Sequence, residues 1–264
     1  MKIGFIGAGN MAEAVIAGLI KSKTVEPSDI LISDIQKNRL IELEKKYGVV
    51  SADSNRAVIT GSEAIILAVK PKDVDNVKEV FAAIKQGSFI ISIMAGITTS
   101  FFEKNDMKIP VVRVMPNTPA LVLSGMTGMC QGKYANRVHM EKAKVILSAV
   151  GKVVEVEEKL MDSLTSISGS GPAYVFLFAE ALLEAAEKNG IDKATAKLLV
   201  ANTLMGGAKM VLESGEEPSV LRRKVTSPGG TTAAALSVFE NMKFKEIVGK
   251  AVEAAKKRSK EMTR

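Results

Sequence analysis

A glycine-rich segment near the start of the chain has the spacing of a nucleotide-binding turn. The residues Gly7-Ala8-Gly9-Asn10-Met11-Ala12 follow an apolar run, open an amphipathic one, and fit the pattern GxGxxG/A. In such a turn the first glycine permits the tight bend, the second lets the backbone approach a pyrophosphate, and the alanine permits close helix packing. The segment predicts a dinucleotide site; a purely structural turn is the alternative. The predicted cofactor-binding residues here are Gly7, Ala8, Gly9, Asn10 and Met11.

Charged residues after the second predicted strand bear on which dinucleotide is bound. Asp34 ends that strand, where an acidic side chain accepts hydrogen bonds from the adenosine ribose of NAD. Lys37 and Arg39 follow closely and would instead attract the 2′-phosphate of NADP. The alternative for both is that they are solvated residues at the start of a helix. This local sequence therefore leaves the choice between NAD and NADP open.

More candidate residues stand where later strands are expected to end. The carboxyl ends of strands in a doubly wound sheet line the ligand crevice, so side chains leaving them face a cofactor. Asn117 lies between two prolines and either contacts the nicotinamide or forms the turn. The predicted cofactor-binding residues of these strand ends are Ala68, Val69, Lys70, Pro71, Ala95 and Asn117.

A second glycine-rich loop has the composition of a binding site for a small anion. It runs Ser227-Pro228-Gly229-Gly230-Thr231-Thr232 and precedes a predicted helix. Glycines admit a turn with outward N–H groups, the helix dipole favours a carboxylate, and the threonine hydroxyls add donors and acceptors. A plain helix N-cap explains the same residues equally well. The segment Ser168-Gly169-Ser170-Gly171-Pro172-Ala173-Tyr174 precedes another long helix.

The elements that must position these residues change in kind along the chain. Short apolar runs alternate with amphipathic segments as far as residue 157, which predicts right-handed crossovers and an α/β Rossmann domain with a parallel, doubly wound sheet. Strands are expected at Ile3–Ile6, Ile30–Ile32, Ala64–Val69, Phe89–Ile93, Val111–Val114 and Lys152–Val156. Helices are expected at Met11–Lys21, Lys37–Tyr47, Asp73–Ile84 and about Ala135–Ala149.

Residues 158–264 are predicted to form an all-α domain for substrate binding and dimerisation. Alanine and leucine dominate there, strand-like alternation is missing, and helices apolar around most of their circumference need a partner to cover them. The expected helices are Pro172–Asn189, Lys193–Glu213, Pro218–Val225, Thr231–Glu240 and Lys243–Glu261.

Composition excludes several classes of function. The chain has 264 residues, 47% of them hydrophobic, and a formal net charge of +7. No apolar run reaches the roughly 18 residues of a membrane helix, and basic residues are not interleaved with aromatics as in a nucleic-acid-binding stripe. One cysteine, Cys130, and one histidine, His139, make a classical zinc or thiol–imidazole site improbable, so we expect no metal. A single cysteine and the absence of a signal peptide favour the cytoplasm.

Taken together, these motifs resemble pyrroline-5-carboxylate reductases over essentially the whole chain. The resemblance covers the starting fingerprint, Ala68–Pro71, Met115–Pro119, Ser168–Tyr174 and the Ser227–Thr232 loop. It implies NAD(P)H-dependent hydride transfer to the imine carbon of L-1-pyrroline-5-carboxylate, which gives L-proline in the last step of proline biosynthesis. It also implies an intertwined homodimer, often assembled further into a homodecamer.

The resemblance also assigns roles to individual residues. Thr232, the one predicted catalytic residue, would hydrogen-bond the ring nitrogen of the substrate. The backbone and hydroxyls of the loop would hold the substrate carboxylate, and the residues so assigned are Ser227, Gly229, Gly230 and Thr231. In the other domain Asn55, Val69, Lys70 and Ala95 would line the cofactor pocket. The family usually prefers NADPH, and Asp34 departs from that preference.

Other readings of the sequence stay open. A β-hydroxyacid dehydrogenase would need a lysine near the start of the helix after Ser168–Tyr174, but the first lysine there, Lys188, stands over four turns along. A broader imine reductase and a non-enzymatic NAD(P)-sensing protein are further alternatives.

Overall fold

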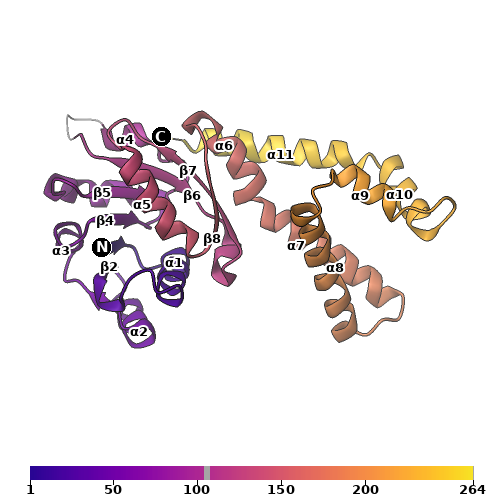
Figure 1. The fold of residues 1–264 in the computed structure, drawn as a ribbon, viewed down its shortest axis with the longest axis horizontal. Coiled ribbons are helices and arrows are strands. Elements are labelled where there is room, and N and C mark those ends of the chain that lie inside the picture. Colours follow the sequence, from indigo (N-terminus) through magenta and orange to yellow (C-terminus); the bar gives the residue numbers. More distant parts are fainter. Residues whose placement is uncertain (104–107, 264) are drawn as a thin grey trace. The chain divides into compact units, whose positions relative to one another are not determined.

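The computed structural model describes residues 1–103 and 108–263 and divides into two compact units (Figure 1). The first unit comprises Met1–Ser170 together with Ala255–Arg264, and the second comprises Gly171–Ala254. The first unit extends past residue 157 because short helical segments after the last strand pack on it. The predicted domain boundary between residues 157 and 158 stays a prediction.

The first unit is built on one eight-stranded sheet with the order β3-β2-β1-β4-β5-β6-β7-β8. Strands β1 to β6 run parallel, β7 is antiparallel to β6, and β8 is parallel to β7. The order reverses between β1 and β4, which is the point where such sheets open a ligand crevice. The strands are β1 Ile3–Ile6, β2 Ile30–Ser33, β3 Val50–Ser51, β4 Ala64–Leu67, β5 Phe89–Ser92, β6 Val111–Met115, β7 Gly125–Gln131 and β8 Gly151–Glu155.

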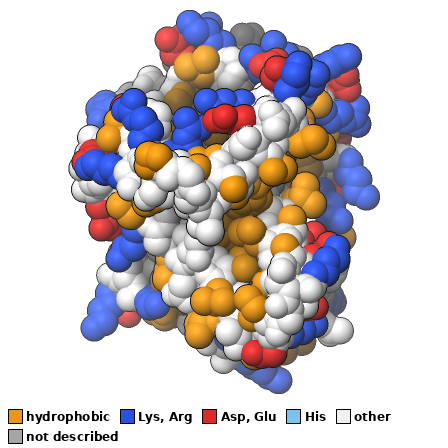
Figure 2. Space-filling model, turned by 90° about the vertical axis from the view of Figure 1, so that its right-hand side faces the viewer, with side chains coloured by type: hydrophobic (Ala, Val, Ile, Leu, Met, Phe, Trp, Pro, Cys, Tyr) orange, Lys and Arg blue, Asp and Glu red, His pale blue; other side chains and the backbone are white. Residues whose placement is uncertain are grey.

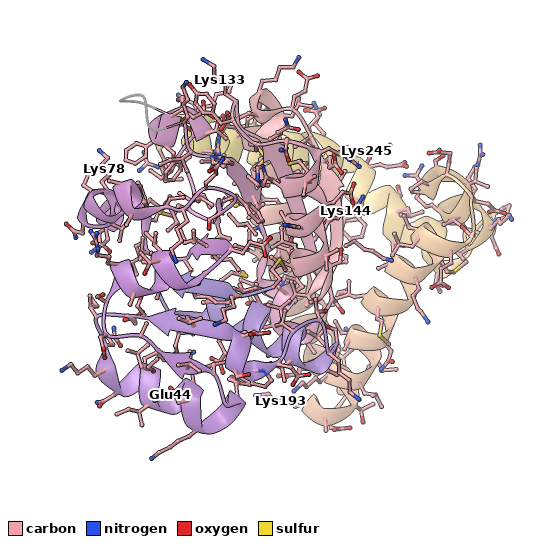
Figure 3. The ribbon with its side chains drawn as sticks, turned by 60° about the vertical axis from the view of Figure 1, so that its left-hand side comes forward. Glu44, Lys78, Lys133, Lys144, Lys193 and Lys245 are labelled. Carbon is pink, nitrogen blue, oxygen red and sulfur yellow. The ribbon has the colours of Figure 1, made fainter. Side chains whose placement is uncertain are left out.

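Helices cover both faces of this sheet, so the central strands are buried on each side. One core cluster joins α1 and α5 to the sheet, and the other joins α3, the 3-10 helix η2 and α4 to the opposite face. Charged side chains such as Lys78 and Lys133 lie on the outside (Figure 3). The helices are α1 Asn10–Lys21, η1 Pro27–Asp29, α2 Lys37–Tyr47, α3 Asn55–Gly61, η2 Pro71–Ala83, α4 Thr99–Glu103, η3 Thr118–Val122 and α5 Arg137–Ser148.

Short helices lead out of the sheet into the second unit, which is helical throughout. The 3-10 helix η4 Glu158–Leu160, α6 Met161–Leu164 and the π-helix η5 Thr165–Gly169 precede the first long helix. A single turn of π-helix commonly marks a functional region. The long helices are α7 Gly171–Lys188, α8 Lys193–Glu213, α9 Pro218–Lys224, α10 Thr231–Asn241 and α11 Phe244–Glu261.

The predicted fold class is confirmed, and the structure refines it. The strands β3 and β7 were not predicted, and β7 makes the sheet mixed rather than wholly parallel. The helix expected at Asp73–Ile84 is present, but it is wound as a 3-10 helix. Its buried side chains Val74 and Val77 are three residues apart, and a three-residue turn stacks both against the sheet.

Candidate active site

A pocket of about 510 Å³ opens where β1, β2 and β4 end, at the reversal of strand order. This is the predicted crevice, and its wall brings together residues that are far apart in the sequence. Predicted cofactor-binding residues that line it are Gly7, Gly9, Asp34, Asn55, Ala68, Val69 and Lys70. Among the predicted residues, Ala8, Asn10, Met11 and Pro71 lie in the adjoining turn or helix starts rather than in the wall itself.

The two glycines of the fingerprint differ, because the backbone requires a glycine at position 7 and leaves open space at position 9. Gly7 has φ +96°, and a Cβ atom there would lie 2.7 Å from the carbonyl carbon of Ala68. Gly9 is the N-cap of α1 and has no side chain to satisfy the first amides, while the space beside its Cα is open. The uncapped amides and the dipole of a twelve-residue helix thus face a pocket wide enough for a ligand. These features fit a dinucleotide diphosphate.

Ala8, buried between those glycines, is held at both ends of its backbone. Its N–H donates to Asp34 Oδ2 at 2.7 Å, and its carbonyl oxygen accepts from Arg39 Nε at 2.9 Å. Asp34 Oδ1 also accepts from the N–H of Gln36 at 2.8 Å. Both oxygens of the predicted ribose ligand are therefore already engaged by the protein.

Glu13, in the first turn of α1, joins that helix to α2. It pairs with Arg39 and accepts hydrogen bonds from Lys46 Nζ at 2.9 Å and the hydroxyl of Tyr47 at 3.0 Å. Partial burial would raise the pKa of Glu13, but the hydrogen bonds from Lys46, Arg39 and Tyr47 outweigh it and lower the pKa to about 2. Sequence reasoning missed this cluster, although Arg39, Lys46 and Tyr47 are spaced to share one face of a helix.

Asn55 fits the cofactor wall, whereas Ala95 and Asn117 lie elsewhere in the first unit. Asn55 begins α3 and accepts from Ser33 Oγ at 2.8 Å. Ala95 packs beside the buried cluster of Met115, Cys130 and Met161.

The amide of Asn117 is largely satisfied within the protein. Its Nδ2 donates to the carbonyl of Ser168 at 3.1 Å, and its Oδ1 accepts from the N–H of Met126 at 2.8 Å. Asn117 thereby ties the turn after β6 to the π-helix and to β7. A contact with the nicotinamide stays a prediction.

In the second unit the Ser227–Thr232 loop leads into α10. Gly229 has φ +68°, and the N–H of Gly230 donates to the carbonyl of Ser227 at 3.0 Å, which closes the turn. Gly230 is the N-cap, and no side chain caps the helix. Among the residues that the structure describes, the hydroxyls of Ser227, Thr231 and Thr232 have no hydrogen-bond partner. The first amides and three hydroxyls are therefore available to an anionic ligand.

Neither Cys130 nor His139 is placed for catalysis. Burial raises the pKa of the Cys130 thiol to about 12, so it stays protonated. His139 caps α5, since its Nδ1 accepts from the N–H of Asn136 while Asn136 Oδ1 accepts from the N–H of His139. Its ring lies against Phe89, with the centroids 5.1 Å apart. Across residues 1–103 and 108–263, no three His, Cys, Asp or Glu side chains gather as metal ligands.

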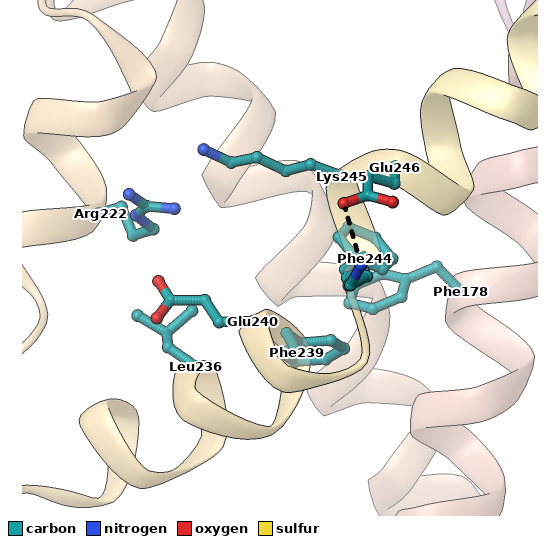
Figure 4. A pocket seen from close by; sticks show the side chains of 9 residues that line it. Phe178, Arg222, Leu236, Phe239, Glu240, Phe244, Lys245 and Glu246 are labelled. Carbon is teal, nitrogen blue, oxygen red and sulfur yellow. Dashed lines mark ion pairs between the residues drawn. The ribbon is translucent and has the colours of Figure 1, made fainter.

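The second unit also has an apolar hollow of about 550 Å³ between α7, α9, α10 and α11 (Figure 4). Its floor is formed by Phe178, Phe239 and Phe244, whose ring centroids lie 5.3 to 6.5 Å apart. Lys243 and Glu246 form an ion pair at its rim. The hollow does not include the Ser227–Thr232 loop, and its remaining lining is Arg222, Leu236, Glu240 and Lys245.

The fold and the nucleotide pocket define an oxidoreductase that binds NADP(H) through a Rossmann domain. Residues 2–96 match a family model described as NADP oxidoreductase, coenzyme F420-dependent, and residues 158–262 match one described as pyrroline-5-carboxylate reductase dimerisation. A pyrroline-5-carboxylate reductase of Synechocystis is 42% identical, covering 99% of this chain and 98% of that protein. The chain belongs to the pyrroline-5-carboxylate reductase family.

Solved structures agree with the match over the full length. A pyrroline-5-carboxylate reductase from Coxiella burnetii superposes with a TM-score of 0.93 at 38% identity, covering 100% of this chain and 98% of that one. The Plasmodium falciparum enzyme, solved with NADP bound, gives 0.88 at 34% identity, covering 100% and 98%. Membership of this family favours the reductase over the dehydrogenase and sensor alternatives.

The helical part of the chain is a dimerisation domain, and the protein forms a homodimer. The second unit buries only Ala196 and Val200 of its hydrophobic side chains in a single chain. Figure 2 shows hydrophobic side chains open to view across the middle of one face, with charged ones mostly toward its margins. In the described residues no helix combines the length and apolar character needed to cross a membrane.

Proposed function

We propose that this protein transfers hydride from NADPH to the imine carbon of L-1-pyrroline-5-carboxylate and so produces L-proline. The observation that carries the proposal is the full-length identity of about 40% with curated pyrroline-5-carboxylate reductases. The residue roles below rest on the geometry of the two sites and on the family resemblance.

The first unit binds the cofactor, which supplies the hydride when it is bound. The amides of Gly9, Asn10 and Met11 hold its diphosphate, because they are the uncapped donors at the start of α1. Asn55 and the Val69–Lys70 segment line the remainder of the pocket. These residues would hold the cofactor and orient it for hydride transfer.

The Ser227–Thr232 loop binds the substrate. The substrate carboxylate accepts hydrogen bonds from the free amides at the start of α10 and from the hydroxyls of Ser227 and Thr231. The hydroxyl of Thr232 hydrogen-bonds the ring nitrogen. A cyclic imine is readily protonated and its carbon then accepts hydride directly, so the protein has to orient the reactants rather than provide a strong acid.

The complete active site is formed by two subunits. The helices of the second unit expose large apolar side chains, among them Phe176, Leu198 and Leu212 at 58%, 66% and 81%, and these need a partner chain. In this arrangement the Ser227–Thr232 loop of one subunit serves the cofactor of its partner. Dimers assemble further into a decamer. The single buried cysteine suits a reducing compartment, and we place the enzyme in the cytoplasm.

The proposed function is tested by cofactor oxidation. Purified protein should oxidise NADPH, or NADH, only after addition of L-1-pyrroline-5-carboxylate, and amino-acid analysis should find proline in equal amount. Folded protein that binds NADPH yet shows no turnover with either cofactor would overturn the assignment.

A further inference from the structure

The peptide groups of Ala8 lie between two flexible residues at the centre of the cofactor turn. Gly7 and Gly9 flank Ala8, and glycine restricts the backbone less than any other residue. A rotation at either glycine would redirect the N–H of Gly9 and the first turn of α1. For the amides to bind a diphosphate without an ordering step, contacts from outside the turn must therefore fix the orientation of its backbone.

Two oppositely charged side chains provide that constraint. Asp34 binds the N–H of Ala8 at 2.7 Å, and Arg39 binds the carbonyl of Ala8 at 2.9 Å. One comes from the end of β2 and the other from the first turn of α2, so the peptide is anchored to two elements besides its own. Hydrogen bonds to charged partners are about twice as strong as neutral ones.

The remaining atoms of both side chains are also engaged. Asp34 Oδ1 accepts from the N–H of Gln36, while the terminal nitrogens of Arg39 pair with Glu13 and with Glu42, the latter at 2.7 Å. Asp34 is the residue that the sequence offered as a ribose ligand, and Arg39 is one of the two, with Lys37, that it offered for the 2′-phosphate. In the structure Asp34 and Arg39 are both directed at the turn.

We propose that Asp34 and Arg39 are positioning residues that hold the Ala8 peptide and thereby set the affinity for the dinucleotide, without selecting between NADH and NADPH. The proposal deepens the proposed function at its cofactor site. It concerns the part of the cofactor that NADH and NADPH share, because the diphosphate is common to both.

The positioning role and direct recognition of the adenosine end predict different changes in the ratio of NADPH affinity to NADH affinity. If Asp34 bound the ribose, its removal would weaken NADH and favour NADPH, whose 2′-phosphate it repels. If Arg39 bound the 2′-phosphate, its removal would weaken NADPH alone. If both hold Ala8, each removal weakens both cofactors by a similar factor, although the two variants change the charge of the pocket in opposite directions.

The test is a titration of each cofactor into the dimeric protein without substrate. The change in nicotinamide fluorescence measures the binding. Asp34→Ala and Arg39→Met should each weaken NADPH and NADH binding by roughly tenfold, which is the loss of one hydrogen bond to a charged group. The double variant should lose little more than either single variant, because the two side chains hold the adjoining peptide groups of one residue and the loss of either frees the same turn. Lys37, the other cation that the sequence offered for the 2′-phosphate, makes no contact with Ala8, so Lys37→Met is the matched control for NADH and should leave NADH affinity unchanged.

Kinetics separate positioning from a general loss of structure. In both variants the KM for the cofactor should rise while kcat at saturating cofactor and the KM for pyrroline-5-carboxylate stay within about twofold of the unmodified protein. If Asp34→Ala does not fold, Asp34→Asn, which keeps one acceptor, is measured in its place and should show a smaller loss for both cofactors.

Opposite shifts in the NADPH-to-NADH affinity ratio for the two variants would overturn the proposal, as would additive losses in the double variant. The binding titration requires no turnover, so it decides the proposal even if the protein proves inactive on pyrroline-5-carboxylate.

Discussion

Thr232 is the residue whose chemistry bears most directly on catalysis. It is half-buried in the first turn of α10, and a substitution can remove either its hydroxyl group or its methyl group while keeping the other. Thr232→Val should lower kcat by about 5- to 150-fold, which corresponds to an oriented hydrogen bond of roughly 1–3 kcal/mol. Cofactor affinity should not change.

The control for Thr232 is the variant that keeps only its hydroxyl. Thr232→Ser should retain most of the rate, because it preserves the donor and acceptor while removing the methyl group. A valine variant within twofold of the unmodified kcat would reduce Thr232 to a residue that merely begins the helix.

Glu13 links acid stability to the cofactor turn. Its pKa of about 2 lies below the ordinary value of 4.5, so the ionised form stabilises the native state above pH 4.5 and this contribution is lost as pH falls towards 2. Glu13→Gln should therefore be less stable than the unmodified protein at pH 6, with the gap narrowing at lower pH. Urea unfolding between pH 6 and 3 measures it.

Glu42→Gln is the comparison for that experiment, because Glu42 is the other, more exposed carboxylate on Arg39. An exposed pair contributes little, about 0–1 kcal/mol, and its loss should leave the acid profile close to that of the unmodified protein. A Glu13→Gln gap that stays constant from pH 6 to 3 would contradict the role given to this carboxylate.

At the scale of elements, the N-terminus of α5 contains a histidine whose pKa is lowered by its surroundings. Partial burial and the nearby positive charge of Lys142 lower the pKa of His139 below 6.5, and the neutral ring accepts the hydrogen bond that completes the capping box. A depressed pKa means that the contribution is complete above pH 6.5 and is lost as pH falls below it.

The measurement is thermal unfolding between pH 7.5 and 5.5, where most carboxylates stay ionised. His139→Gln can still accept in the capping box but does not titrate there, so its Tm should vary less with pH than that of the unmodified protein. Parallel pH profiles for the two proteins would show that His139 does not stabilise α5 through its neutral form.

The sequence was most informative where an element is decided by its own residues. Continuous apolar runs predicted β1, β4, β5 and β6, because a strand buried on both faces has apolar side chains at successive positions. The strand β7 has no such signal. It contains two glycines, and a side chain at Gly128 would collide with Leu164 of α6. The glycine is therefore required by packing against a later helix, which the sequence of the strand alone does not indicate.

The same distinction separates the parts of the site. The Gly7–Ala12 fingerprint was recognisable because its geometry is local. The partners of Asp34 and Asn117 were not, since Ala8 is 26 residues from Asp34 and Ser168 is 51 from Asn117. A carboxylate at the end of β2 suggests a ribose ligand until the fold brings a backbone amide within 2.7 Å of it.

At the scale of the whole molecule, the composite site can be tested by complementation. Gly9→Glu fills the space next to the cofactor turn, and Gly230→Glu with Thr232→Val disables the substrate loop, so each homodimer should be inactive. In a heterodimer with sites formed across chains, one site carries both lesions and the other carries none. Activity should then return to about half of the unmodified level per dimer.

Sites contained within single chains give the opposite result, because every site of the heterodimer would keep one lesion. The heterodimers are verified by two affinity tags before assay. Persistent inactivity of verified heterodimers would rule out a site shared between subunits, and it would leave the homodimer itself unaffected.

The central claim, hydride transfer to a cyclic imine, is tested most directly by following the hydride itself. NADPH deuterated at both C4 positions is incubated with the protein and L-1-pyrroline-5-carboxylate, and the product is examined by mass spectrometry and NMR. The account predicts proline that carries one deuterium, at the ring carbon that had been part of the C=N bond, in equal amount to the NADPH oxidised. Cofactor oxidation without deuterated proline, or no oxidation by folded protein that binds NADPH, would contradict it.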